Sequence, residues 1–319
     1  MKILKKVLLI GLLALIVGAL IFVIFFAVSG WNFKNLSSVV VQNEIYTENS
    51  ENKISTVNID YDNADVEIVF SDVDTLTVSY PKTFTRSGKP ASEIHLSDSD
   101  GELSITSESI WHRNIGINWV EEKVYITVPT QRACDLNIKT DNGDILVCGG
   151  EGSTVVSAFF DTDNGDIDTE RATLVSEGEL YFTTSNGEID AGKLYANKLT
   201  METDNGDISL RGGEITGEVY IGTDNGDVEL EGDLKAMSLK VETDNGEISL
   251  TNGTISADKI ILNSDNGDIE AKILGRKSDY SISVNVSLGD SNIANTSGGT
   301  KTLEVGCDIG DIEIYFTEN

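Results

Sequence analysis

Acidic residues recur along most of this chain at intervals of roughly 20 residues, and they are its best candidates for chemistry. One acid directly follows a glycine, and another stands two residues before the same glycine. Ca²⁺ is a hard cation that takes six to eight oxygen ligands, so adjacent carboxylates could bind it. The candidate calcium ligands are Asp141, Asp144, Asp163, Asp166, Asp204, Asp207, Asp224, Asp227, Asp244, Glu247, Asp265 and Asp268.

The same acids also have a purely structural interpretation. An aspartate after Asn-Gly suits a turn, and negative charge opposes the aggregation of a β-rich surface. Stacked unit charges about 4.8 Å apart would repel one another by roughly 1 kcal/mol per neighbour in water. The nonapeptide of calcium-binding β-rolls, GGxGxDxUx, does not occur. Solvated acids and calcium ligands both stay open as interpretations of the sequence.

Residues typical of catalysis are scarce. The chain has two histidines, and we find no nucleophile elbow, P-loop, HExxH motif or paired-cysteine metal pattern. The segment WHRNIGINW at 111–119 alone clusters aromatic and basic side chains, with Trp111, His112, Arg113 and Trp119. It could bind a glycan or a protein partner through rings and a guanidinium, or cap one end of the fold. We expect no enzyme; a carbohydrate-active enzyme is the less favoured alternative.

Three cysteines add little chemistry. Cys307 occupies the place of an inward threonine and is expected to be a buried free thiol. Cys134 and Cys148 lie on the two arms of one repeat and could form a disulfide.

The acids are positioned by a repeat that covers strands as well as a turn. The phrase TDNGDI, or a close variant, begins at residues 140, 162, 184, 203, 223, 243 and 264. Apolar residues stand seven and five places before each glycine and two places after it, an alternation that gives each strand one buried face. Degenerate copies at 61–68, 98–105, 287–293 and 307–314 bring the number of copies to eleven, and KVYITVP at 123–129 reads as an additional strand.

This repeat predicts an all-β protein, specifically a parallel β-solenoid (β-helix) with rungs of about 20 residues. Asparagines of successive rungs would stack with each amide bonding the next, and the threonines would form a hydroxyl ladder. Because Asn-Gly between alternating runs is also a strong hairpin signal, an antiparallel β-meander or propeller is the alternative.

The N-terminus predicts the location of the protein. No charge interrupts residues 7–28, which as a helix would be about 33 Å long, enough to cross a bilayer. Lysines within residues 1–6 predict a cytoplasmic tail, and therefore an extracytoplasmic C-terminal part, by the positive-inside rule. Residues 29–52 are expected to be a tether and 53–319 the repeat domain. A cleavable signal peptide is the alternative to an uncleaved signal anchor.

Net charge limits the partners. The formal charge of −30 opposes binding to nucleic acid or to an anionic lipid surface. It favours a cation, a basic protein or a neutral glycan. We expect no cofactor apart from calcium, and a glycan, the cell wall or a protein as partner.

The strand KVYITVP followed by successive NGDI-type rungs behind one N-terminal apolar segment resembles a bacterial β-strand-repeat family named for adhesins and largely uncharacterised. The resemblance covers roughly residues 53–319. It implies a membrane-tethered, non-enzymatic surface protein that acts in adhesion or in the cell envelope. An accessory protein of an envelope-stress sensing system is the alternative function, and the family supplies no catalytic residues.

Overall fold

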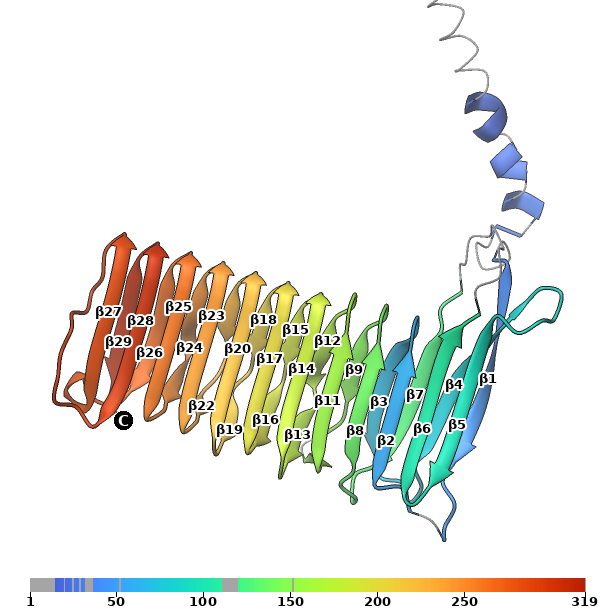
Figure 1. Cartoon of the computed structure of the whole chain (residues 1–319), viewed down its shortest axis with the longest axis horizontal. Helices are drawn as coiled ribbons and strands as arrows, with labels where there is room; N and C mark the ends of the chain where they lie inside the picture. The colour runs from blue at the N-terminus through green and yellow to red at the C-terminus, as the bar shows by residue number, and fades with distance from the viewer. Residues whose placement is uncertain are drawn as a thin grey trace, which may run out of the picture. The chain divides into compact units, whose positions relative to one another are not determined.

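The computed structural model describes residues 15–19, 21–24, 26–28, 30–31, 37–51, 53–110, 120–150 and 152–318. Most of these residues are in strands, which form two large sheets (Figure 1). The chain divides into two compact units. Unit 1 comprises Met1–Asn43, Pro81–Glu93 and Ser109–Glu122, and unit 2 comprises Glu44–Tyr80, Ile94–Glu108 and Lys123–Asn319. We call unit 2 the solenoid unit.

The first sheet, sheet B, has twelve strands among the described residues. In spatial order they are β27 (Tyr280–Leu288), β28 (Lys301–Ile309), β25 (Lys259–Asn266), β23 (Ser238–Asn245), β20 (Glu218–Asn225), β17 (Lys198–Asn205), β14 (Glu179–Asn186), β11 (Ser157–Thr162), β8 (Asp135–Thr140), β2 (Thr56–Tyr61), β6 (Glu102–Ser109) and β5 (Ser92–Ser99).

The second sheet, sheet A, has seventeen strands among the same residues, most of them shorter than those of sheet B. In chain order they are β1 (Val39–Thr47), β3 (Asp65–Ser71), β4 (Thr77–Thr85), β7 (Lys123–Pro129), β9 (Ile145–Cys148), β10 (Ser153–Val155), β12 (Ile167–Arg171), β13 (Thr173–Ser176), β15 (Ile189–Ala191), β16 (Lys193–Ala196), β18 (Ile208–Leu210), β19 (Gly213–Ile215), β21 (Val228–Leu230), β22 (Leu234–Lys235), β24 (Ile248–Ser256), β26 (Ile269–Leu274) and β29 (Ile312–Thr317). A short 3-10 helix, η2 (Lys277–Asp279), precedes β27.

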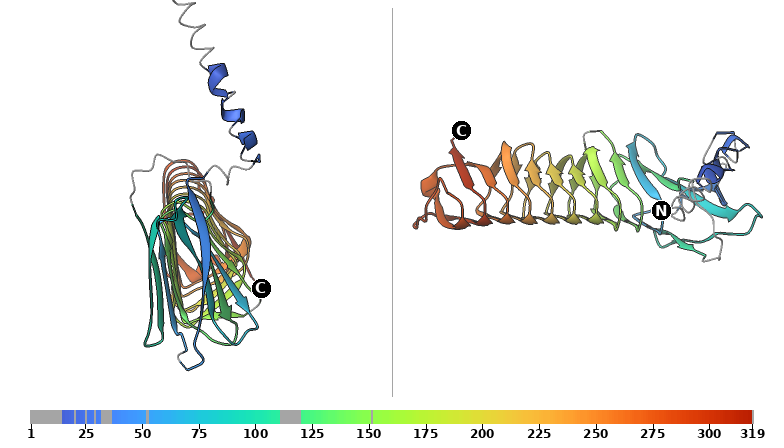
Figure 2. Two further views of the ribbon diagram at one scale, coloured as in Figure 1. Left: turned by 90° about the vertical axis from the view of Figure 1, so that its right-hand side faces the viewer. Right: turned by 90° about the horizontal axis from the view of Figure 1, so that it is seen from above.

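Successive repeats stack in parallel with identical positions in register. In β14 and β17, for example, Leu180 pairs with Leu199 and Asn186 with Asn205. The alternating apolar side chains point inward and are almost fully buried between the sheets, as the period-two pattern predicts. Figure 2 shows the coils of the solenoid unit lying one on another as flattened loops. The solenoid prediction is confirmed for this unit, and the antiparallel meander or propeller is wrong, because the strands flanking each Asn-Gly lie in different sheets.

The corner between the sheets is packed too tightly for any side chain at the glycine. A Cβ on Gly226 would lie 1.9 Å from the carbonyl oxygen of Gly206, and one on Gly206 would lie 1.9 Å from that of Gly187. The Asn-Gly pair therefore serves close coil-to-coil approach at a bend, and not the two-residue hairpin that the same dipeptide usually signals.

The coils at the two ends of the solenoid unit are stacked out of chain order. The strand β2 lies between β6 and β8, although β6 follows it in the chain. At the other end β28, from the last coil, lies between β25 and β27. Each chain end of the repeat is thus held inside the stack by a coil on both sides (Figure 1).

The predicted repeat copy at 98–105 is out of phase with the structure. Asp100 and Gly101 both have positive φ and connect β5 to β6 as a two-residue hairpin turn. Leu103 and Ile105 consequently pair with Val57 and Ile59, the positions before the corner and not those after it. The additional strand predicted at 123–129 is confirmed as β7, which completes the coil that β6 begins.

Unit 1 contains the described N-terminal helical residues and a short irregular β region. Residues 15–19, 21–24 and 26–28 are helical, whereas residues 7–14, 20 and 25 of the predicted membrane span lie outside the described part. Among described residues no helix has the length and apolarity needed to cross a membrane. The Arg86 guanidinium donates to the carbonyl oxygen of Ser37 at 2.8 Å. Within the predicted tether at 29–52, residues from Val39 to Thr47 form the strand β1.

Candidate functional site

The outer face of sheet B carries a groove of about 680 Å³ within the solenoid unit. Two outward-facing positions of successive strands supply most of its lining, since alternate residues of a strand share one face. They stand four and two places before the corner glycine; the buried threonine position between them and Tyr220, six places before Gly226, complete the lining. The lining residues are Thr183, Thr184, Ser185, Glu202, Thr203, Asp204, Tyr220, Gly222, Thr223, Asp224, Glu242, Thr243, Asp244, Asn263, Ser264, Asp265, Asn285, Gly306, Cys307 and Asp308.

Glycines hollow out this groove. The outward position four places before the corner glycine holds Gly222 and Gly306 where neighbouring coils carry Glu202, Glu242 or Asn263. A Cβ on Gly222 would lie 2.7 Å from the Tyr220 hydroxyl, so this ring occupies the space that a side chain would fill. The groove therefore exists where glycine replaces the larger side chain that adjoining coils carry at the same position of the repeat.

Carboxylates dominate the groove. Seven of its lining residues are acidic and none is lysine or arginine: Glu202, Asp204, Asp224, Glu242, Asp244, Asp265 and Asp308. Partial burial, followed by the nearby charges of Glu242 and Glu202, raises the pKa of the Tyr220 hydroxyl. At the rim the Lys240 ammonium lies 5.3 Å from the Tyr220 ring centroid and 2.6 Å from a Glu242 carboxylate oxygen. A cation is thus held at this rim by a carboxylate and an aromatic face together.

The predicted calcium ligands fall into two columns. Of those standing two places before the glycine, Asp204, Asp224, Asp244 and Asp265 line the groove, whereas Asp141 and Asp163 lie on coils outside its lining. Burial, followed by the charges of Asp163 and Asp62, raises the pKa of Asp141. Within the described residues there is no group of three or more His, Cys, Asp or Glu side chains placed to hold a metal ion. The calcium site stays a prediction from sequence.

The acids directly after the glycine have a structural role that the sequence did not reveal. The Asp227 carboxylate accepts the backbone N–H of Glu247 on the next coil at 2.7 Å. The same bond recurs from the N–H groups of Asp144, Asp166, Glu188, Asp227, Asp311 and Asp290 to the acid of the adjoining coil. Every acceptor in these bonds is an aspartate, whose side chain has the length to reach one coil along. Partial burial, followed by the nearby charges of Asp227 and Asp268, raises the pKa of Glu247.

The predicted asparagine ladder is confirmed. Each side-chain amide from Asn142 to Asn266 donates at 3.1 Å to the amide oxygen of the asparagine in an adjoining coil, which is Asn63 for Asn142. The predicted hydroxyl ladder is wrong in its partners. Buried threonines donate to the carbonyl oxygen of the preceding coil's glycine, as Thr223 does to Gly206 at 3.0 Å, because that carbonyl would otherwise face inward without a donor.

Other predicted sites have separate outcomes. Trp111, His112, Arg113 and Trp119 lie outside the described residues, so the partner or cap segment stays a prediction. Cys134, Cys148 and Cys307 are free, and the possible disulfide between the first two is absent. Cys307 is buried, as expected, and its thiol donates to the Gly267 carbonyl oxygen at 3.3 Å.

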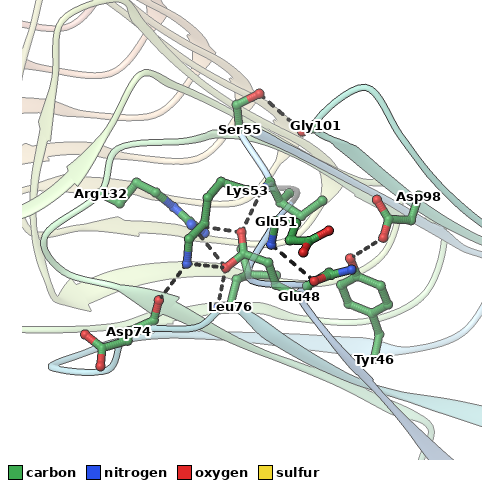
Figure 3. A network of polar contacts seen from close by, with 12 residues as sticks. Tyr46, Glu48, Glu51, Lys53, Ser55, Asp74, Leu76, Asp98, Gly101 and Arg132 are labelled. Atoms are coloured by element: carbon green, nitrogen blue, oxygen red, sulfur yellow. Dashed lines mark hydrogen bonds and ion pairs between the residues drawn. The ribbon is translucent and has the colours of Figure 1, made fainter.

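A buried carboxylate, Glu48, was missed by the sequence analysis because its segment was assigned to the tether. Its side chain is inaccessible and lies 2.8 Å from an Arg132 guanidinium nitrogen and 3.5 Å from the Lys53 ammonium (Figure 3). It also accepts the N–H groups of Ile54 and Leu76. Burial alone would raise the pKa of Glu48, but these hydrogen bonds and the Arg132 charge outweigh burial and lower it. Glu48 thus joins three segments at one end of the solenoid unit.

The fold and its outer face define a β-solenoid protein with a polar groove on one sheet. The chain belongs to the family described as Toastrack DUF4097, which matches residues 54–223 and 213–319. A search of curated proteins gave no match.

Several solved bacterial structures are similar over most of the chain. One, described as a "putative adhesin" from Parabacteroides distasonis, shares 12% identity over 86% of this chain and 97% of its own, with a TM-score of 0.42. Another of that description, from Bacteroides fragilis, shares 14% identity over 86% and 97%, with a TM-score of 0.37. A third, described as a "putative lipid binding protein" from P. distasonis, shares 16% identity over 87% and 96%, with a TM-score of 0.37.

Proposed function

We propose that this chain is a non-enzymatic, adhesin-like surface protein that presents the acidic groove of sheet B to a cationic partner. The groove carries the proposal. Seven carboxylates and the Tyr220 ring line it, and none of its lining residues is basic. Such a surface repels anions and concentrates cations, and its extended form along several coils suits a chain-like ligand such as a basic peptide or a cationic polymer of the cell wall.

The proposal includes a membrane tether. Residues 7–28 supply the apolar length for a signal anchor, and lysines precede it, which would place the repeat domain outside the cell. Adhesion or an interaction with the envelope is the role that this location gives a rigid binding face.

Binding is tested with the purified full chain in detergent micelles. Poly-L-lysine should bind with an affinity that falls as salt rises, whereas poly-L-glutamate and dextran should not bind. The double variant Glu202→Gln/Glu242→Gln should weaken poly-L-lysine binding several-fold. Its matched control, Glu229→Gln/Glu270→Gln, removes the same charge from sheet A and should change binding little. Equal losses in both variants would mean that net charge and not the groove attracts the polycation.

Location is tested on intact cells that express the full chain with a C-terminal epitope. External protease should remove the epitope while a cytoplasmic marker survives, and the chain should stay in the membrane fraction. An epitope protected until the cells are lysed would contradict the proposed orientation.

A further inference from the structure

Seven Asn-Gly pairs of this chain stand at the same corner of successive coils, with exposed asparagine side chains. Asn-Gly is the dipeptide in which the backbone most easily closes on the side chain, because glycine offers no Cβ to hinder it. The coils give these chemically equivalent pairs two different hydrogen-bonding environments. We propose that the corner is a site of spontaneous deamidation that is fastest at Asn142 and Asn164.

The reaction needs no cofactor. The backbone nitrogen of the glycine attacks the side-chain carbonyl carbon of the asparagine, forming a C–N bond. The bond to the side-chain nitrogen breaks, that nitrogen takes up the proton lost from the glycine N–H, and ammonia leaves. Water then opens the resulting succinimide at either carbonyl to give aspartate or isoaspartate. The balance is one water consumed and one ammonia released, with no change of oxidation state.

One restraint is common to all seven asparagines. Each side-chain amide is held by its ladder bond of 3.1 Å and by a second contact to a main-chain carbonyl oxygen of the preceding coil, 3.2 Å long for Asn142 and 3.5 Å long for Asn245. These bonds oppose the rotation that would bring the side-chain carbonyl carbon toward the glycine nitrogen. The ladder should therefore slow deamidation everywhere relative to the unfolded chain.

The second restraint differs between corners. The attacking N–H is donated to the next coil's main-chain carbonyl from Gly206, Gly226, Gly246 and Gly267, at 3.0–3.1 Å. Among the described residues, the N–H groups of Gly143 and Gly165 have no such acceptor. Asn186 pairs with Asn205 as the bonded corners pair with their neighbours, so its corner is not counted with these two. A nitrogen whose proton is engaged must break that bond before it can attack, whereas the nitrogens of Gly143 and Gly165 are already available.

The expected product has a physical consequence. Each event adds a carboxylate to a column that lies between two columns of acids and removes an amide donor from the ladder. Since the two susceptible asparagines are on consecutive coils, successive events would place like charges one coil apart.

The experiment follows all seven pairs within one molecule. The full chain in detergent micelles is incubated at pH 8.5, with a parallel sample in concentrated urea, and peptide mass spectrometry measures each site over time. In urea the seven sites should react at similar rates. In the folded chain Asn142 and Asn164 should react about fivefold faster than Asn205, Asn225, Asn245 and Asn266, the factor that one hydrogen bond of about 1 kcal/mol provides. Asn252–Gly253, which lies within β24, is scored separately.

Amide hydrogen exchange supplies an independent measurement. The N–H of Gly165 should exchange faster than the N–H of Gly206. Equal exchange of these two amides, or deamidation of the four bonded corners at the rate of Asn142 and Asn164, would overturn the proposal.

Discussion

The corner glycine shows how much one missing side chain decides in this fold. At Gly226 the neighbouring backbone occupies the volume of a Cβ, whereas at Gly222, four residues earlier, only the end of the Tyr220 ring does. Backbone cannot move without shifting the adjoining coil, but a tyrosine ring can rotate away. The two positions therefore separate a structural glycine from a glycine that shapes the groove.

We predict that Gly226→Ala destabilises the protein by about 3 kcal/mol or more, the cost of overpacking at a rigid site. Gly222→Ala, the matched control, should cost less than about 1 kcal/mol. Urea unfolding followed by circular dichroism measures both. Similar losses in the two variants would show that the corner is not limited by backbone contact.

Among the elements, the asparagine ladder joins strands of adjacent coils where main-chain pairing ends. An interior member such as Asn245 donates to Asn225 and accepts from Asn266. Asn266 is the last member, because the next coil carries Ile309 at this position. The two residues thus differ by one ladder bond while sharing the same corner conformation.

This difference predicts unequal costs. Asn245→Ala should lower the free energy of unfolding by about 2 kcal/mol, since two bonds of about 1 kcal/mol each are lost. Asn266→Ala should lose about 1 kcal/mol by the same reasoning. Thermal and urea melts of both variants check the ratio, and an equal cost would mean that the amides act independently of the ladder.

The Glu48 contacts join the segment after β1, the residue before β4 and the segment after β7 within the solenoid unit. Glu48→Gln leaves the Arg132 guanidinium without its counter-charge, although two of its nitrogens already have no hydrogen-bond partner among the described residues. We expect a loss of about 3 kcal/mol, as for other buried ion pairs broken on one side. The double variant Glu48→Gln/Arg132→Met should recover part of it. No recovery would show that the carboxylate acts through the Ile54 and Leu76 N–H groups instead.

The sequence predicts the middle of the solenoid better than its ends. Identical columns such as Asn205 and Asn225 fix the register there, because stacking like on like satisfies both the apolar core and the corner amides. At 98–105 the period-two alternation fits equally well when shifted along the chain, so Leu103 and Ile105 were placed on the wrong side of the corner. No local sequence pattern predicts that β28 lies between β25 and β27 although it follows β27 in the chain. This order depends on which of the two strands pairs with the free edge of β25.

The groove was harder to predict than the ladder for a related reason. Repetition marks the residues that hold coils together, whereas the groove depends on positions where the repeat is broken. Gly222 and Gly306 differ from Glu202 and Glu242 in the same column, and this contrast is the signal that alignment of the outward positions would have given. Glu48 gave no such signal, because its partners Leu76 and Arg132 lie far from it along the chain.

At the scale of the whole molecule, two opposing groups of carboxylates set the pH dependence of stability. The pKa values of Asp141, Asp190 and Glu247 are raised, each first by burial and then by neighbouring acids. The folded chain therefore binds protons more readily than the unfolded chain at these sites, and stability rises as pH falls toward their usual pKa. Glu48, whose pKa is lowered, contributes stability above the usual glutamate pKa that is lost at lower pH.

We therefore predict that the melting temperature rises as pH falls from 7.5 toward the usual carboxyl pKa values of about 4 to 5, and falls at lower pH, where the stabilising contribution of ionised Glu48 is lost. Scanning calorimetry at constant ionic strength measures the profile. In high salt the rise should flatten, because screening weakens the repulsion between the exposed acids. In Glu48→Gln the fall at low pH should shrink while the rise persists. A melting temperature that only decreases from pH 7.5 downward would mean that solvent already screens the repulsion between the stacked carboxylates. The acidic columns would then not lower the free energy of unfolding at neutral pH.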